Sequence, residues 1–502
     1  MNRHIRLVGA GIMALFVVLF AQLNWVQIFH SSALNNNPLN SRRITKEYDT
    51  ARGNIISSDG QLLAYSKQTT GNFKYERVYP MGSLFGQITG YFSFTYGSDG
   101  AEKSDDRFLT GASAQFKLPT SLSELQNELA NANRAENVNL TVSAKLQAVA
   151  AKALGSATGA VVALDPKTGA VLAMYANPSF DPNLLSGTSS QQVVANWNAL
   201  VKAAGNPLSS GAYRNRYPPG STFKVVTAAA VYDHDPSLAT KNYPVTNQIT
   251  LPLTNNQKLS NFAGEHCGGQ LLQMFTVSCN TGFASVGLDL GAGSLAGEAT
   301  SFGFNSVPPI DLPAAAGSNF PPAASFDQDP AALAKSAIGQ ENVSASPLEM
   351  ALVAAAVGHG GTMMIPHVLK SVTNSQNQVV STYQPKPWRQ ATSATTAADM
   401  QTLMLSVVNA SNGTGVAARI PGVQVAGKTG TAQTGVGTTD DWFTAYGPTN
   451  DPQVAVCAVV LNQPSADQYQ GGTVAAPIAK AVMEAALAPS AGSGTPTGTT
   501  GT

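Results

Sequence analysis

The chain has 502 residues, and its 29 Lys and Arg residues balance its 29 Asp and Glu residues, so the formal net charge is zero. Charged residues make up only 12% of the chain and hydrophobic residues 43%. This composition argues against a nucleic-acid-binding protein, which normally carries an excess of basic residues, and against intrinsic disorder, which combines low hydrophobicity with high net charge. The length indicates two or three domains.

The N-terminus carries one long apolar run. Arg3 and Arg6 precede residues 7–23, which are almost entirely apolar, and a helix of about 20 such residues crosses a bilayer. Basic residues before the run predict that the N-terminus lies inside and the remainder outside. The alternative is a cleaved signal peptide with a weak cleavage site at residues 31–33, but the run exceeds the usual length for such a peptide. We therefore predict that residues 1–29 are a cytoplasmic tip and a single transmembrane anchor, with the rest of this cell-membrane protein extracytoplasmic.

Composition divides the remaining chain into further segments. Residues 30–140 begin with a polar, Asn-rich tether. They continue with segments whose sequence pattern is typical of β-strands, separated by turn pairs such as Arg52-Gly53, which predicts a β-rich module. Residues 141–488 begin with helical spacing and then alternate Ala-rich helices with short strands, over a length that can bury a large core. Residues 489–502 contain only Pro, Ser, Ala, Gly and Thr, which predicts a disordered tail.

A β-hairpin is predicted near the start of the second module. The apolar runs Gly159–Asp165 and Ala170–Ala176 flank a short turn that contains Lys167-Thr168-Gly169. Lys and Gly are ordinary turn residues in such a position. We therefore interpret this Lys-Thr-Gly as structural.

Ser221 and Lys224 form the one Ser-x-x-Lys pattern in the chain. Pro and Gly precede Ser221, and the apolar segment Val225–Val231 follows Lys224, so we expect Ser221 to open a helix. Residues three apart share one face of a helix. An ammonium group with apolar flanks loses hydration and its pKa falls, which would allow Lys224 to take the hydroxyl proton of Ser221. A serine at a helix start is also an ordinary structural cap, so this pattern alone is weak.

Two later motifs strengthen the interpretation. Ser278-Cys279-Asn280 lies 57 residues after Ser221 (278 − 221), and Lys428-Thr429-Gly430 lies 207 residues after it (428 − 221). A second Ser-x-Asn at residues 375–377 falls in a polar stretch and is interpreted as a loop. The order Ser-x-x-Lys, Ser-x-Asn, Lys-Thr-Gly matches the signature of penicillin-binding proteins and serine β-lactamases.

With these motifs the chain resembles the class B penicillin-binding proteins, the monofunctional D,D-transpeptidases of peptidoglycan synthesis, and among them the actinobacterial penicillin-binding protein A group. Residues 47–64 and 76–102 are similar to the N-terminal pedestal of that group, and residues 178–183 and 338–340 match its catalytic module. The resemblance implies an α+β penicillin-binding/transpeptidase fold. This fold is expected to contain an antiparallel five-stranded sheet flanked by helices. The chain is expected to add a β-rich pedestal of the dimerisation type (30–140) and a single transmembrane helix.

The sequence departs from the pattern of the family at two places. Glu341 stands where many relatives have Gly, and Asp440-Asp441 stand where relatives often have a His-Ala pair. Neither departure lies within the three motifs.

The resemblance assigns a role to each motif residue. Ser221 is the nucleophile that forms an acyl-enzyme, Lys224 is the acylation base, and Ser278 and Lys428 relay a proton to the leaving amine. The backbone N–H groups of Ser221 and Thr431 form the oxyanion hole. The expected substrate-binding residues are Asn280, Thr429, Gly430 and Thr431.

The implied partners are D-Ala-D-Ala stem peptides, β-lactam inhibitors, the membrane and a RodA/FtsW-type glycan polymerase, in wall synthesis that serves cell shape or cell division. A D,D-carboxypeptidase of the same fold and a non-catalytic β-lactam sensor or scaffold are the alternatives. A β-lactamase is disfavoured, because an anchor and a pedestal would serve it poorly.

The histidines are dispersed and no Cys-x-x-Cys occurs, so we expect no metal site and no cofactor. Cys267 and Cys279 are close enough to form a disulfide in an oxidising compartment, which the sequence leaves open.

Overall fold

The computed structural model describes residues 2–29, 48–70, 73–112, 135–464 and 470–488. The tether predicted after the anchor and the tail predicted at 489–502 lie outside the described residues. The first element is helix α1 (Asn2–Phe29). Its apolar stretch, Arg6–Val26, is long enough to cross a membrane, and none of it is buried against the rest of the protein.

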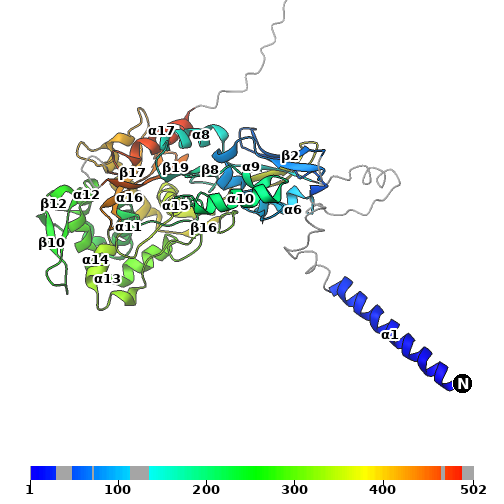
Figure 1. Ribbon diagram of the computed structural model, residues 1–502. Coiled ribbons are helices and arrows are strands. Elements are labelled where there is room, and N and C mark those ends of the chain that lie inside the picture. The colour runs from blue at the N-terminus through cyan, green and yellow to red at the C-terminus, as the bar shows by residue number, and fades with distance from the viewer. Residues whose placement is uncertain (1, 30–47, 71–72, 113–134, 465–469, 489–502) are drawn as a thin grey trace, which may run out of the picture.

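The pedestal consists of short strands and short helices (Figure 1). Its elements are β1 (Ile55–Ile56), β2 (Leu62–Gln68), β3 (Tyr75–Val78), η1 (Gly82–Leu84), α4 (Gly86–Thr89), β4 (Phe92–Ser93), β5 (Gly97–Ser98), α5 (Gly100–Ser104), α6 (Asp106–Leu109) and β6 (Asn137–Leu140).

The pedestal sheet also takes two strands from much later in the chain. Its strand order is β15-β14-β6-β1-β2-β3, in which β14 (Leu369–Thr373) and β15 (Val379–Thr382) come from the 141–488 segment. β14 pairs antiparallel with β6, with Val372 opposite Val138. The contiguous division at residue 140 did not anticipate this pairing, because backbone hydrogen bonds between strands far apart in sequence leave no local pattern. The Ser-x-Asn at 375–377 lies in the turn between these strands, as predicted.

A buried ion network holds the pedestal together. The carboxylate of Glu102 accepts hydrogen bonds from Arg52 Nε at 3.1 Å, Arg77 Nε at 2.5 Å and the Tyr79 hydroxyl at 3.2 Å. Arg52 also donates to Asp106 at 2.9 Å. Glu102 is fully buried, and the two guanidinium groups hold its pKa below the ordinary value against the opposing effect of burial.

Removing the carboxylate of Glu102 is expected to destabilise the protein strongly. Glu102→Ala leaves the buried Arg77 guanidinium without this counter-charge and Arg52 with the partly exposed Asp106, which typically costs about 3–5 kcal/mol and lowers the melting temperature by about 3–5 °C for a protein of this size. Thermal unfolding of the full-length protein in detergent measures this. Asp451→Ala is the matched control, because Asp451 pairs with Lys167 at the surface and exposed pairs contribute little. Equal melting temperatures for the two variants would contradict the prediction.

The catalytic module is built on a five-stranded antiparallel sheet with the order β17-β18-β19-β7-β8, as predicted. Its strands are β7 (Gly159–Leu164), β8 (Val171–Asn177), β17 (Ala426–Gln433), β18 (Thr438–Gly447) and β19 (Val454–Pro464). β7 and β8 form the predicted hairpin. Lys167-Thr168-Gly169 lies in its turn, which confirms that this second Lys-Thr-Gly is structural.

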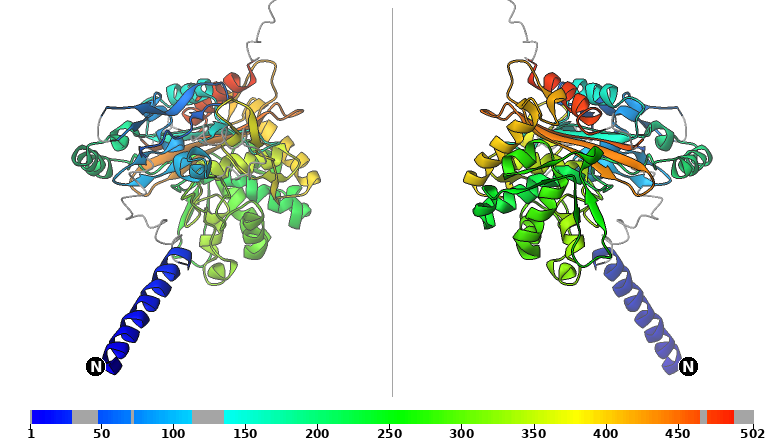
Figure 2. Two further views of the ribbon diagram at one scale, coloured as in Figure 1. Left: turned by 90° about the vertical axis from the view of Figure 1, so that its right-hand side faces the viewer. Right: turned by 90° about the vertical axis from the view of Figure 1, so that its left-hand side faces the viewer.

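Helices cover both faces of this sheet (Figures 1 and 2). Alternate strand residues point to opposite faces: Val161 and Phe443 pack with α8 (Ala144–Leu154) and α17 (Ala475–Leu487), whereas Val162 and Trp442 belong to the core of the opposite face. The helices of the opposite face are α11 (Lys224–His234), α12 (Leu271–Thr276), α13 (Asn280–Ser301), α14 (Pro330–Ser336), α15 (Pro347–Gly358) and α16 (Ala394–Asn409). α9 (Asn183–Ser186) and α10 (Ser190–Lys202) lie between β8 and Ser221 in sequence.

A double hairpin, defined here as residues 243–269, lies at the end of the molecule opposite the pedestal (Figure 1). β9 (Tyr243–Thr246) pairs with β12 (Cys267–Gly269), and β10 (Gln248–Thr250) pairs with β11 (Lys258–Ser260). At its base, Lys241 and the Tyr243 hydroxyl both bond to Asp289 of α13, at 2.7 and 2.8 Å. A small sheet of β13 (Thr362–Met364) and β16 (Pro387–Gln390) completes the strands described.

Candidate active site

Ser221, the predicted nucleophile, lies in a 3₁₀ turn, η2 (Gly220–Phe223), that leads directly into α11. The sequence predicted that Ser221 would open the α-helix itself, whereas that helix begins at Lys224. The relation between the two residues is preserved, because residues three apart eclipse one another in a 3₁₀ turn. Ser221 is partly exposed, and Lys224 is completely buried among the apolar residues of α11.

Two glycines allow the serine turn to approach its neighbours closely. A Cβ on Gly430 of β17 would lie 2.9 Å from Pro219 O and 3.1 Å from Thr222 N. A Cβ on Gly339 would lie only 2.1 Å from the carbonyl oxygen of Gly220, and the Gly220 N–H donates to Gly339 O at 3.0 Å. The Gly of Lys-Thr-Gly therefore allows β17 to lie beside the serine turn. The 338–340 segment, which matches the catalytic module of the family, contacts the same turn through Gly339.

Ser278 lies between the two lysines. Lys224 Nζ donates to Ser278 O at 2.7 Å and to Asn280 Oδ1 at 2.8 Å, and it lies 3.4 Å from Ser278 Oγ. Lys428 Nζ donates to Ser278 Oγ at 2.8 Å and to Thr429 O at 3.0 Å. The three motifs, which are separated by up to 207 residues (428 − 221), thus meet at one hydroxyl group.

The burial of both amines weakens their hold on a proton. Desolvation, together with the nearby charge of Lys428, lowers the pKa of Lys224 well below its ordinary value. Desolvation also lowers the pKa of Lys428 to about 7. The predicted loss of hydration at Lys224 is confirmed. A neutral Lys224 amine has two N–H bonds, which serve its two short hydrogen bonds, and one lone pair that remains to accept a proton.

The predicted substrate-binding residues line one cleft of about 720 Å³. Ser221, Ser278, Asn280 and Thr429–Thr431 contribute to its wall, and so do the double hairpin and Lys335. On the rim, Glu341 has a left-handed backbone with φ 64° and pairs with Lys335 at 3.0 Å. A Gly at position 341, as in many relatives, would adopt this backbone without strain.

Two residues that the sequence did not single out contact the threonines of β17. Thr414 Oγ1 is 2.7 Å from Thr429 Oγ1, and the Gly471 N–H donates to Thr431 Oγ1 at 3.3 Å. Thr429 is buried and engaged with Thr414, whereas Thr431 is partly exposed, so Thr431 is the more accessible of the two to a ligand. No spacing rule links residues 414 or 471 to the motifs.

A model of the penicillin-binding protein transpeptidase domain matches residues 159–484, and one of the penicillin-binding protein A dimerisation domain matches residues 52–135. The chain belongs to the penicillin-binding protein transpeptidase family. Among the described residues, no cluster of three or more His, Cys, Asp or Glu side chains that could hold a metal ion was found.

The relatives of this penicillin-binding protein support the predicted subgroup. It is 35% identical to peptidoglycan D,D-transpeptidase PbpA of Mycobacterium tuberculosis over 97% of this chain and 99% of that one. It is 36% identical to PbpA of Mycolicibacterium smegmatis, again over 97% and 99%. A solved structure of penicillin-binding protein A from M. tuberculosis, as a ceftriaxone acyl-enzyme complex, has a TM-score of 0.80 and 34% identity, covering 88% of this chain and 100% of that one. The resemblance to the penicillin-binding protein A group is thereby confirmed.

The Asp440-Asp441 departure places a buried acid beside the Lys-Thr-Gly strand of this penicillin-binding protein. Asp441 lies opposite Thr431 in the β17–β18 ladder. It is completely buried, and the Thr439 side chain beside it opposes the effect of burial on its pKa. Burial raises its pKa from 3.8 to about 6. Asp440, by contrast, accepts a hydrogen bond from the Asn462 N–H at 3.0 Å.

Asp441→Ala is expected to stabilise the protein at neutral pH. Because the folded-state pKa of Asp441 lies above the unfolded value, ionisation costs folding free energy as the pH rises through about 6. The gain should be about 1–2 kcal/mol near pH 8, after allowance for solvent screening, and should be much smaller near pH 4, where the folded-state carboxyl is protonated and the unfolded-state carboxyl, with its ordinary pKa of 3.8, is only partly ionised. Melting curves at both pH values measure this. An equal gain at pH 4 and pH 8 would contradict the ionisation argument.

Proposed function

We propose that this protein is a D,D-transpeptidase that cross-links peptidoglycan stem peptides through an acyl-enzyme on Ser221, and that β-lactams acylate the same residue. The observation that carries the proposal is the convergence of Lys224 and Lys428 on Ser278 beside the cleft. The names of the two PbpA relatives and the acyl-enzyme structure of penicillin-binding protein A also support it.

In the acylation step, Ser221 Oγ attacks the carbonyl carbon between the two D-alanines of a stem pentapeptide. The hydroxyl proton passes to the neutral amine of Lys224, whose depressed pKa leaves its lone pair available. The negative charge that develops on the carbonyl oxygen is stabilised by the N–H groups of Ser221 and Thr431.

Collapse of this intermediate breaks the bond to the terminal D-alanine. The leaving nitrogen takes a proton from Ser278, which is resupplied by Lys428 through their hydrogen bond at 2.8 Å. A pKa of about 7 suits Lys428 to this exchange, because both of its protonation states are then populated near neutral pH. Asn280 holds the substrate amide, and Thr429, Gly430 and Thr431 receive the terminal carboxylate.

An amine from a neighbouring stem peptide then attacks the acyl-enzyme carbonyl, forms the cross-link and frees Ser221. Attack by water instead would make the protein a D,D-carboxypeptidase, which the same residues would serve. A third alternative is a non-catalytic β-lactam sensor or scaffold.

Product analysis separates these functions. The full-length protein in detergent is incubated with a lipid-linked pentapeptide glycan polymer, and the muropeptides are identified by mass spectrometry. Cross-linked dimers are expected. Release of D-alanine without cross-links would replace the proposal with a carboxypeptidase, and penicillin labelling without either product would indicate a sensor.

We also propose that α1 anchors the protein with its catalytic module outside the cytoplasm, because Arg3 and Arg6 precede the apolar stretch of α1. By family analogy, α1 and the pedestal would contact a RodA/FtsW-type glycan polymerase. Added protease should degrade the catalytic module in intact spheroplasts of the native host, and the polymerase should co-purify from its membranes. Protection of the module, or absence of the polymerase, would count against the respective proposal.

A further inference from the structure

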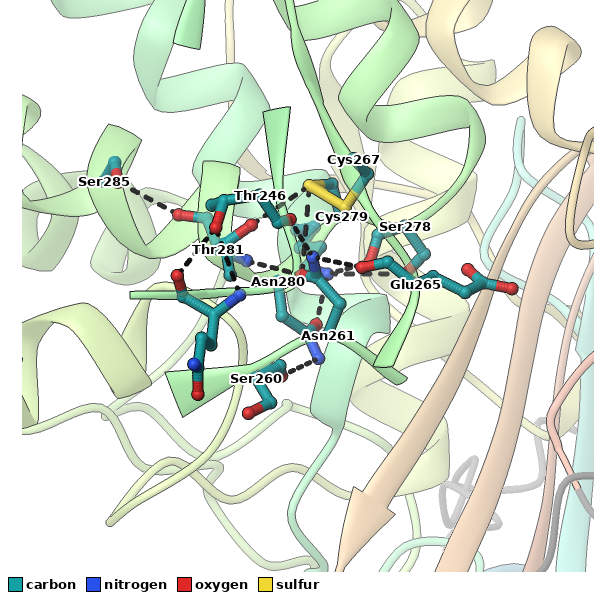
Figure 3. Close-up of a disulfide and its surroundings, with 12 residues drawn as sticks. Thr246, Ser260, Asn261, Glu265, Cys267, Ser278, Cys279, Asn280, Thr281 and Ser285 are labelled. Atoms are coloured by element: carbon teal, nitrogen blue, oxygen red, sulfur yellow. Dashed lines mark hydrogen bonds between the residues drawn. A yellow bond between two sulfur atoms is a disulfide. The ribbon is translucent and has the colours of Figure 1, made fainter. Parts of the chain in front are cut away.

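The Ser-x-Asn motif is attached to the double hairpin that forms one wall of the cleft. Residues 257–263 of the double hairpin line the cleft, and Ser278–Asn280 immediately precede and begin α13. Ser278 has a left-handed backbone with φ 61°, which costs a non-glycine residue free energy and persists only where surrounding contacts hold it. Two such contacts connect the motif to the double hairpin (Figure 3).

Asn261 is the first of these contacts. Its side-chain NH₂ donates to Thr246 O at 2.8 Å and to Glu265 O at 2.9 Å, both within the double hairpin. Its Oδ1 accepts from the Thr281 N–H at 2.9 Å. This N–H lies in the first turn of α13, where backbone donors have no partner within the helix. Asn261 is only 7% exposed, so water does not readily replace these bonds.

A disulfide is the second contact. Cys267 of β12 is bonded to Cys279, which is the middle residue of Ser278-Cys279-Asn280 and is almost fully buried. The bridge left open by the sequence is therefore present. It joins the double hairpin covalently to the residue between the two groups that accept hydrogen bonds from Lys224 (Figure 3).

We propose that Asn261 is a positioning residue for acylation. It holds the start of α13 against the double hairpin, and so keeps Ser278 O and Asn280 Oδ1 at hydrogen-bond distance from Lys224 Nζ. The Cys267–Cys279 disulfide is a second tie that acts in parallel. This inference rests on the proposed function, since it assumes that Lys224 is the base that activates Ser221.

The consequence concerns the direction of the Lys224 lone pair. The two short hydrogen bonds of Lys224 at 2.7 and 2.8 Å fix the orientation of its amine. If the start of α13 shifts, these acceptors move together, and the amine is no longer held with its lone pair free for Ser221. Small displacements of groups that orient a reaction can reduce a rate about a hundredfold.

The test measures acylation of the full-length protein in detergent by a fluorescent penicillin, with the first-order acylation rate at saturation separated from the affinity of the initial complex. Asn261→Ala is expected to lower that rate by about ten- to a hundredfold and to shift the pH dependence of the rate. Its labelling stoichiometry should be unchanged.

Gln147→Ala is the matched control. Gln147 has the same inventory of bonds: its NH₂ donates to Leu84 O at 3.0 Å and Met174 O at 2.8 Å, and its Oε1 accepts from the Met174 N–H at 2.8 Å. It is 1% exposed and lies on α8. Its loss should lower the melting temperature about as much as the loss of Asn261, with the acylation rate and its pH profile unchanged.

Two further arms separate the parts of the inference. Asn261→Asp keeps the acceptor for Thr281 N–H and loses both donors to the double hairpin, so an intermediate rate is expected. Reduction of the disulfide should lower the rate more in Asn261→Ala than in the wild-type protein, because in that variant the disulfide is the tie that remains between the motif and the double hairpin.

An acylation rate and pH profile for Asn261→Ala equal to those of Gln147→Ala would overturn the inference. Equal effects of reduction in both backgrounds would overturn the parallel role of the disulfide. Failure of the wild-type protein to be acylated would instead count against the proposed function.

Discussion

Ser221→Ala is expected to abolish covalent labelling of the protein by penicillin. The acyl bond requires an oxygen nucleophile at this position, and loss of the nucleophile in serine acyl transfer lowers the rate by about a millionfold. The intact mass of wild-type protein should increase by the mass of one penicillin molecule, because ring opening releases no fragment of the drug, and peptide mapping should place the adduct on Ser221.

Ser285→Ala serves as a control for this labelling. Ser285 lies on α13 and donates to Thr281 O at 3.0 Å (Figure 3), so its variant tests whether loss of a serine hydroxyl near the Ser-x-Asn motif is enough to change labelling. It should label fully. An adduct on the Ser221→Ala protein at the wild-type rate would refute the assignment of the nucleophile.

Lys224→Arg is expected to lower the acylation rate by about a thousandfold, within the usual range for removal of a general base. Arginine retains N–H donors at this position but does not lose its proton at any accessible pH, so the substitution removes the base. The labelling rate measures this, with Lys480→Arg as a control, because Lys480 lies on α17 in a partly exposed pair with Glu484.

The pH profile provides a second measurement on Lys224. Acylation requires the neutral amine, so the wild-type rate should fall as the pH drops through the pKa of Lys224. Because burial and the charge of Lys428 lower that pKa well below its ordinary value of 10.5, the midpoint of this fall should lie well below pH 10.5. A limb centred near 10.5 would show that the buried amine is not the group that titrates.

The sequence predicted features whose causes are local. The apolar run of α1, the hairpin of β7 and β8 and the turn at Lys167-Thr168-Gly169 all follow from the order of neighbouring residues. The three motifs were also recognisable, because each occupies three or four consecutive positions. Their order along the chain, together with the resemblance, was sufficient to predict the family and the five-stranded sheet.

The serine turn marks where local reasoning was incomplete. A Ser after Pro-Pro-Gly suggests a helix cap, yet Ser221 lies in η2, before α11 begins. That turn is shaped by Gly339 and Gly430, which lie more than a hundred residues away and allow close backbone contacts. A pattern of neighbouring residues does not contain those contacts.

By itself, the sequence predicted which residues carry the chemistry, and it determined that one helix is long enough to cross a membrane. Only the tertiary structure decided that Ser278 Oγ lies between two buried amines, that Cys267 and Cys279 are joined, and that Asn261 Oδ1 accepts a hydrogen bond from the Thr281 N–H. The physical reason is that desolvation and hydrogen bonding between distant segments arise only when those segments pack together. From the sequence alone Lys224 has the ordinary pKa of a lysine, and it is burial in the packed core around α11 that lowers this pKa.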